Sequence, residues 1–119
     1  MRRLLPRLLL LGLFVASPSQ AGDAIRLAPG RSAIFSLQEN ATTGYSWRID
    51  QDASRNLGIL SISDGGRSGS RRRMVGSPSV RHWNIRALKP GQAEIVFVYQ
   101  RPWEPAPVQT RSVEVKVAP

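Results

Sequence analysis

The side chains that carry out most enzyme chemistry are scarce in this sequence. It has one histidine, His82, no cysteine, and eight carboxylates scattered along 119 residues. Nucleophilic hydrolysis needs a hydroxyl or thiol beside a base. The alternation around His82 turns it away from Trp83 and Ile85, so we interpret it as an ordinary surface histidine. The nearest carboxylate pair, Asp50 and Asp52, is typical of a solvated turn. The sequence therefore predicts no enzyme, no metal site and no cofactor.

Three loops are stronger candidates for function, because loops held by a rigid scaffold commonly carry it. The first, Asn40-Ala41-Thr42-Thr43-Gly44, is uncharged and offers two hydroxyls and a glycine that can adopt a positive φ. The second is Gly76-Ser77-Pro78-Ser79. The third, Arg101-Pro102-Trp103, places an indole at the tip of a turn that prolines stiffen. Taken singly, each loop is as well explained by a plain turn.

The elements that would position these loops are strands. Period-two alternation and frequent turn residues, without a helical period, predict an all-β domain. The predicted strands are Ala24–Ala28, Ser32–Glu39, Tyr45–Asp50, Leu57–Ser63, Val80–Leu88, Gln92–Gln100 and Val113–Val117. About seven short strands indicate an immunoglobulin-like β-sandwich, with a small barrel as the alternative. Because the loops of a sandwich gather at its two ends, the three candidate loops can share one end.

The first 21 residues have the three parts of a secretory signal peptide. A basic start (residues 1–7) precedes an apolar run (residues 8–16) and small residues at Ser19 and Ala21. The apolar run is too short to cross a bilayer, which needs about 20 residues. We therefore expect export to the periplasm or outside the cell, with one domain over residues 22–119 and no membrane contact after cleavage. Without cysteine, that domain must rely on its hydrophobic core.

The order of the loop motifs resembles the chagasin-type inhibitors of papain-like cysteine proteases. The matching residues are Asn40-x-Thr42-Thr43-Gly44-Tyr45, Gly76-Ser77-Pro78 and Arg101-Pro102-Trp103, and the resemblance extends over residues 25–117. It implies an immunoglobulin-like fold with three loops at one end that enter the active-site cleft of the protease. The sequence departs from the family pattern at Ala41, where the family most often has proline, and at Ser79, where the middle loop often ends in glycine.

The resemblance also implies a role for each loop. Thr42 and Thr43 would lie over the catalytic Cys and His of the protease. Trp103 would stack on an aromatic side chain near the primed subsites, and Arg101 would anchor the same loop by hydrogen bonds or a cation–π contact. Gly76 to Pro78 would lie against the non-primed side. The implied function is a reversible, monomeric inhibitor whose partner is a papain-like cysteine protease, with no cofactor and no nucleic acid.

A second hypothesis assigns function to the basic residues. Residues 64–73 have no apolar side chain and are predicted to form a solvated loop. Their arginines, between Arg67 and Arg73, hold much of the net charge, which falls from +9 to +6 when the three arginines of the signal segment leave. Such a cluster attracts polyanions. An adhesion or polyanion-binding module acting through residues 67–73 is therefore the alternative to the inhibitor.

Overall fold

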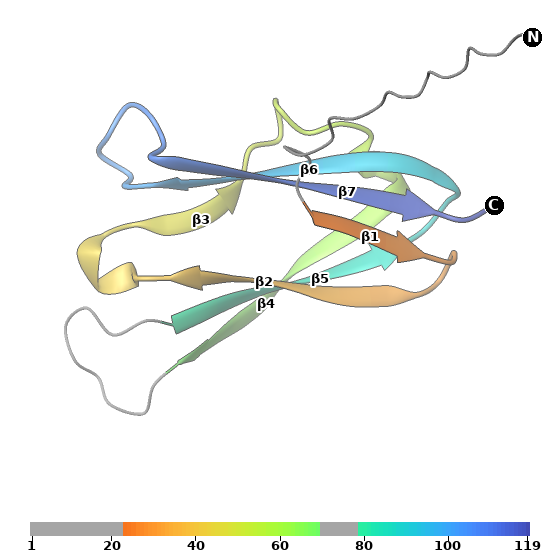
Figure 1. The fold of residues 1–119 in the computed structure, drawn as a ribbon, viewed down its shortest axis with the longest axis horizontal. Coiled ribbons are helices and arrows are strands. Elements are labelled where there is room, and N and C mark those ends of the chain that lie inside the picture. The colour runs from red at the N-terminus through yellow and green to blue at the C-terminus, as the bar shows by residue number, and fades with distance from the viewer. Residues whose placement is uncertain (1–22, 70–78) are drawn as a thin grey trace, which may run out of the picture.

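The computed structural model describes residues 23–69 and 79–119, and over these residues it is a two-layer sandwich of seven strands (Figure 1). One sheet has the strand order β1-β7-β6-β3 and the other has the order β2-β5-β4. The elements are β1 (Asp23–Leu27), β2 (Ser32–Glu39), η4 (Ala41–Thr43), β3 (Ser46–Ile49), η5 (Leu57–Ile59), β4 (Leu60–Gly69), β5 (Ser79–Ala87), β6 (Gly91–Gln100) and β7 (Gln109–Val117). The predicted all-β sandwich is confirmed, while the predicted signal segment lies outside the described residues. None of the described segments is a helix with the length and apolarity to cross a membrane.

The core lies between the two sheets, as the alternation of apolar and polar residues along the strands predicts. Phe97 of β6 is fully buried and stacks on Phe35 of β2, with ring centroids 5.1 Å apart. It also packs against the tilted ring of Trp83 of β5, with centroids 4.7 Å apart. Ile85 and Ile95 are also fully buried beside them. Each large apolar side chain buried in this way contributes about 1.5–3 kcal/mol. In a chain without disulfides, this core supplies the rigid body from which the loops project.

β4 differs from the prediction for its part of the chain. The predicted strand over residues 57–63 is confirmed for residues 60–63, but its start is the 3-10 turn η5. The predicted loop over residues 64–73 is wrong for residues 64–69, because β4 continues to Gly69. Residues 64–69 lack apolar side chains, yet their backbone pairs with β5 as far as Ser79. Patterning reports the burial of side chains and not the pairing of the backbone, so this extension has no signal in the alternation. Residues 70–73 lie outside the described residues.

A β-bulge lets β4 make this extension. The register with β5 shifts between Asp64 and Gly66. Gly66 has a φ of +85°, and its N–H donates to Oδ1 of Asp64 at 2.8 Å. Bulges bend and twist a strand and are common where a sheet ends. β7 also starts earlier than predicted, at Gln109 rather than Val113, because its first residues pair with β6 while their side chains remain exposed.

The connections that carry the candidate loops lie at one end of the sandwich. The β2–β3 and β6–β7 connections project from the same end, which is on the left in Figure 1. The end of β4 and the start of β5 reach it too, because Glu39, Ser79 and Gly69 are neighbours across the three-stranded sheet. The turns from β1 to β2 and from β5 to β6 lie at the opposite end (Figure 1).

Truncation of Phe97 tests whether this core holds the sandwich together. We expect Phe97→Ala to lower the free energy of unfolding by about 3–5 kcal/mol, because it removes both ring contacts and leaves a cavity. Ile34→Ala is the matched control, since Ile34 is 69% exposed on β2 and its loss should change stability by less than about 0.5 kcal/mol. Denaturant titration measures both values, and equal losses in the two variants would contradict this account of the core.

Candidate functional site

The first candidate loop is closed by bonds among its own residues. The backbone N–H of Thr43 donates to the carbonyl of Asn40 at 3.1 Å, and its Oγ1 donates to the same carbonyl at 2.6 Å. Oγ1 of Thr42 donates to Oδ1 of Asn40 at 2.9 Å. These bonds wind Ala41–Thr43 into the 3-10 turn η4, and Gly44 ends it at a φ of +89°, where a residue with a side chain would be strained. Thr42 and Thr43 are both exposed. The loop is therefore a formed, uncharged protrusion.

The third candidate loop is also a defined turn. The N–H of Glu104 donates to the carbonyl of Arg101 at 3.1 Å, and Nε2 of Gln100 donates to the carbonyl of Glu104 at 2.7 Å. Pro102 and Trp103 form the exposed tip, and the indole of Trp103 is 70% exposed. Tryptophan is enriched among the residues that contribute most to protein–protein binding, so this exposed indole is a candidate contact residue.

The two loops touch each other, and glycine is what permits the contact. A Cβ built on Gly44 would lie 2.6 Å from Cη2 of Trp103, which is closer than real Cβ atoms come to other atoms. Nε of Arg101 donates to the carbonyl of Thr43 at 3.0 Å, and its guanidinium lies 4.2 Å above the ring of Tyr45. The resemblance implied that Arg101 anchors its loop by hydrogen bonds or a cation–π contact, and the structure supplies a partner of each kind within the chain. The two loops therefore form one continuous rim.

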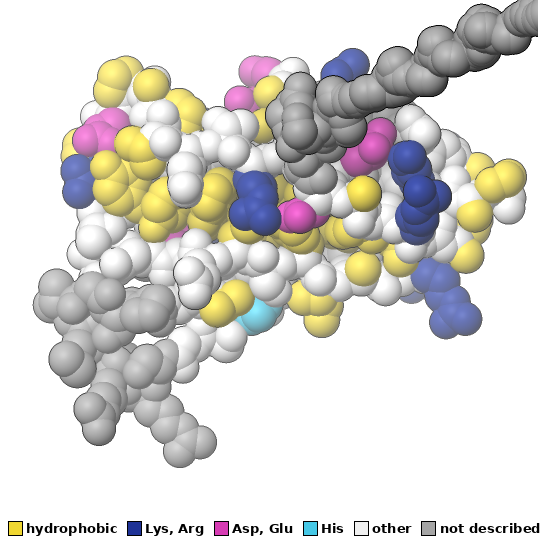
Figure 2. Space-filling model, viewed as in Figure 1, with side chains coloured by type: hydrophobic (Ala, Val, Ile, Leu, Met, Phe, Trp, Pro, Cys, Tyr) yellow, Lys and Arg dark blue, Asp and Glu magenta, His cyan; other side chains and the backbone are white. Residues whose placement is uncertain are grey.

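An aromatic column connects this rim to the core. Tyr45 stacks on Tyr99 with ring centroids 5.2 Å apart, and Tyr99 stacks on Trp47 at 4.8 Å. The hydroxyl of Tyr99 accepts the backbone N–H of Asn40 at 2.9 Å, and Nε1 of Trp47 donates to the carbonyl of Gln38 at 2.8 Å. Trp47 is only 5% exposed, so the column begins in the interior. In Figure 2, hydrophobic side chains emerge at the end of the molecule that carries these loops.

The second candidate loop is described only in part. Gly76, Ser77 and Pro78 lie outside the described residues. Ser79 is the first residue of β5, and its Oγ donates to the carbonyl of Glu39 at 3.1 Å. Ser79 therefore lies directly beside the start of the first loop, on the neighbouring strand of the three-stranded sheet.

The outer face of that sheet carries the histidine. His82 is half-buried, with Nδ1 lying 2.6 Å from Oγ of Ser36 and Nε2 lying 2.8 Å from Oγ of Ser68. Serines on the two flanking strands thus engage both ring nitrogens. The prediction that His82 faces away from Trp83 is confirmed, since Trp83 is buried on the inner face. Among the described residues, no three His, Cys, Asp or Glu side chains are grouped so that they could hold a metal ion.

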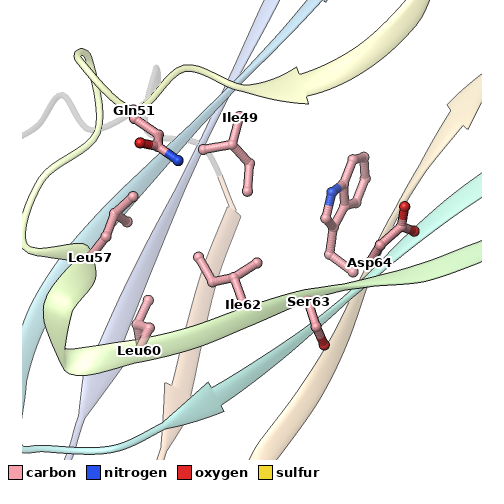
Figure 3. Close-up of a pocket in the computed structure, with 8 residues that line it drawn as sticks. Ile49, Gln51, Leu57, Leu60, Ile62, Ser63 and Asp64 are labelled. Atoms are coloured by element: carbon pink, nitrogen blue, oxygen red, sulfur yellow. The ribbon is translucent and has the colours of Figure 1, made fainter.

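A pocket of about 380 Å³ lies between the edges of β3 and β4. Figure 3 shows Ile49 of β3 and Ile62 of β4 projecting into the same space, with Leu57 and Leu60 nearby. The remaining lining residues are Gln51, Ser63, Asp64 and Trp83. Sequence patterning did not identify this pocket, because it arises where the edges of the two sheets separate. Its lining combines apolar and polar side chains and lacks a cluster of reactive ones.

Asp64 borders this pocket as an ion pair with Arg81. The N–H of Gly66 and then the guanidinium of Arg81, which donates to Oδ2 at 2.9 Å, lower the pKa of Asp64 below 3.8. A carboxylate whose pKa is lower in the folded state stabilises that state at pH values above its pKa in the unfolded chain. This contribution to stability is lost as the pH falls through the pKa of the folded state. The same guanidinium lies 5.0 Å above the ring of Trp83, so the pair is joined to the core.

Substitution of Asp64 tests that pKa shift. We expect Asp64→Asn to lose less stability than the wild type as the pH falls from about 5 to about 2, because the substituted chain has no carboxylate to protonate there. Urea unfolding at several pH values gives the two curves. Parallel curves below about pH 4 would show that the bonds from Gly66 and Arg81 do not favour the ionised form.

Substitution of Gly44 tests the contact between the loops. Gly44→Ala should cost more stability than Gly30→Ala, since both glycines have a positive φ (+89° and +85°) but only a Cβ on Gly44 meets an indole. The shared backbone strain is about 1–2 kcal/mol, and the displacement of Trp103 adds to it in Gly44→Ala alone. Thermal unfolding and the indole NMR resonance of Trp103 measure the two effects. An unmoved resonance in Gly44→Ala would contradict the close packing.

Comparison with known proteins agrees with the fold. Residues 26–117 match the family model described as chagasin family peptidase inhibitor I42. Amoebiasin-1 of Entamoeba histolytica is 32% identical over 81 residues, covering 68% of this chain and 76% of that protein. The crystal structure of the cysteine protease inhibitor EhICP2, from the same organism, has a TM-score of 0.66 and 26% identity and covers 83% of this chain and 90% of its own.

A third relative shows the same fold. PbICP-C, whose structure was solved in complex with falcipain-2, has a TM-score of 0.61 and 23% identity, covering 90% of this chain and 97% of its own. The family match spans both described candidate loops and the strands that hold them. The chain belongs to the chagasin family of peptidase inhibitors, I42.

Proposed function

We propose that this chain inhibits papain-like cysteine proteases reversibly and competitively, by laying the rim of Asn40–Gly44 and Arg101–Trp103 along the active-site cleft. The observation that carries this proposal is the contact of Trp103 with Gly44, which makes one projecting edge from two loops far apart in the sequence. The family assignment supports it, as does the description of EhICP2 as a cysteine protease inhibitor.

The chemistry of the first loop suits a narrow cleft. Its tip is uncharged, so insertion needs no costly desolvation of an ion. Ala41–Thr43 are wound into a 3-10 turn by bonds to Asn40, so the loop does not offer an extended segment of the kind that a protease would cleave. Thr42 and Thr43 lie at the exposed tip and would face the catalytic Cys and His of the protease.

The third loop would supply the main side-chain contact. The exposed indole of Trp103 can stack on an aromatic side chain near the primed subsites, which adds about 0.5–1.5 kcal/mol to the energy of its burial. Arg101 holds the loop in place through Thr43 and Tyr45, so little conformational freedom remains to be lost on docking. We extend the proposal to Ser79 and to Gly76–Pro78, which would lie against the non-primed side.

Residues 67–69 are the described part of the basic segment, and no observation on them favours a separate binding module. Within the described part of that segment, Arg67 is held by the buried carboxylate of Glu39, with Nε 2.5 Å from Oε1. This ion pair leaves its guanidinium less available to a polyanion. We retain the inhibitor as the function and also propose that residues 1–21 direct export, so that the target would be met in the periplasm or outside the cell.

Inhibition kinetics with variants of the rim test the proposal. The protein spanning residues 22–119 should inhibit papain competitively, and Trp103→Ala should weaken inhibition by about 30-fold or more, the effect of losing a hot-spot side chain worth about 2 kcal/mol. Thr43→Asp should weaken it as well, by placing a charge at the loop tip. Ile34→Ala serves as the control because Ile34 is equally exposed on the outer face of β2.

Two results would count against this assignment. Full papain activity at micromolar concentrations of the folded protein, repeated with cathepsin-L-type enzymes, would refute inhibition of this protease class. Equal weakening by Trp103→Ala and Ile34→Ala would retain the inhibitor but remove the rim as its contact surface.

A further inference from the structure

Glu39 is a charged side chain in an apolar position. Its side chain is 0% exposed. Among the described residues, Glu39 alone is both buried and polar or charged. The alternation of β2 explains why it points inward, since Phe35 and Leu37 face the core and Glu39 is the next residue on the same face. An isolated carboxylate is strongly disfavoured in such a place, so its surroundings must compensate for the lost water.

Two hydrogen-bond donors and a second guanidinium surround this carboxylate. Oε2 accepts the backbone N–H of Trp47 at 2.8 Å, and Oε1 accepts Nε of Arg67 at 2.5 Å. Nη1 of Arg81 lies 4.0 Å from Oε2. Arg81 is itself mostly buried, with 16% of its side chain exposed, and it also donates to the carbonyl of Trp47 at 3.3 Å. Bonds to a buried carboxylate are short and strong, because little water competes for the carboxylate itself.

The positions of these donors in the chain give Glu39 its significance. Glu39 directly precedes the first loop, and Trp47 lies in β3 directly after it. Arg67 lies near the end of β4, before residues 70–78, and Ser79 follows them at the start of β5 and donates to the carbonyl of Glu39. Glu39 therefore contacts the strands on both sides of both connections. In Figure 1, β2, β4 and β5 reach the same end of the sandwich.

We propose that Glu39 is a positioning residue that fixes the β2–β3 loop relative to the β4–β5 hairpin before a protease is bound. The inference rests on the proposed function, because the protease is what the fixed loops would meet. Glu39 itself is buried and does not touch the partner. Its carboxylate joins four strand ends, so that the first loop is not free to move away from the rest of the rim.

This role has a kinetic signature that separates it from direct contact. A loop that samples several arrangements is competent to bind for only part of the time, so the observed association rate falls by that fraction. Once the complex has formed, the protease itself holds the loop, and the dissociation rate changes little. A contact residue such as Trp103 behaves in the opposite way, since its loss mainly raises the dissociation rate.

The test uses a substitution that preserves shape and removes charge. Glu39→Gln keeps an oxygen for the N–H of Trp47 but presents an amide donor to Arg67. We expect the association rate with papain to fall about tenfold. This is the effect of having to fix the backbone conformation of about one additional residue on binding. The dissociation rate should stay within about twofold. Hydrogen exchange at the amides of Asn40 and Thr43 in the free protein should become faster.

Glu94→Gln is the matched control, because Glu94 also bonds to an arginine and a serine. Its partners, Arg55 and Ser112, lie outside the β2–β3 and β4–β5 connections, so this variant should leave the association rate unchanged. If Glu39→Gln does not fold, Arg67→Gln replaces it, since Arg67 is 49% exposed and should lower the association rate in the same direction.

The outcomes separate this inference from the function beneath it. An unchanged association rate and unchanged exchange in the folded Glu39→Gln variant, or in Arg67→Gln where that replaces it, would overturn the positioning role while wild-type inhibition stands. A change confined to the dissociation rate would also overturn it. If the wild type does not inhibit papain, the proposed function fails, and the exchange rates at Asn40 and Thr43 still decide whether Glu39 fixes the loop.

Discussion

The rim depends on the absence of one side chain. The indole of Trp103 lies against the backbone of Gly44 at a distance that no Cβ would allow, and the positive φ of this glycine turns the loop into that position. Arg101 then bonds to the carbonyl of the preceding residue, Thr43, and covers the ring of Tyr45. Two loops that contact each other so closely form a single surface of fixed shape. An inhibitor that blocks a cleft without being cleaved needs this property, because a preformed surface loses little entropy when it docks.

The interior of the sandwich is apolar in the middle and contains a buried charge near the end that carries the loops. Phe97 and its neighbours in the middle are fully buried and hold the two sheets together. At the end that carries the loops, the inner face of β2 changes from Phe35 and Leu37 to the carboxylate of Glu39. An apolar residue there would pack as well, yet it would not specify which strand ends come together. Hydrogen bonds and ion pairs are directional, so a buried carboxylate with defined donors selects one arrangement of the loops.

Much of this architecture could be predicted from the sequence, for an identifiable reason. Strands such as β2 alternate cleanly because one face is buried, and Phe35 and Leu37 lie where that alternation places them. The extension of β4 to Gly69 could not be predicted, because backbone pairing leaves no trace in side-chain polarity. The contact of Trp103 with the first loop depends on the distance between two strand ends, which local spacing does not encode. Glu39 was missed because a carboxylate that ends a strand is ordinarily solvated.

The most direct test of the central claim is hydrogen–deuterium exchange of the inhibitor, measured free and bound to papain. The account predicts that slower exchange in the complex is concentrated in Asn40–Gly44 and in residues 101–104, with little change at the opposite end of the sandwich around Gly30. Slower exchange centred on the outer face of the sheet around Ser36 and His82, with the two loops unchanged, would contradict the claim that the shared rim occupies the cleft.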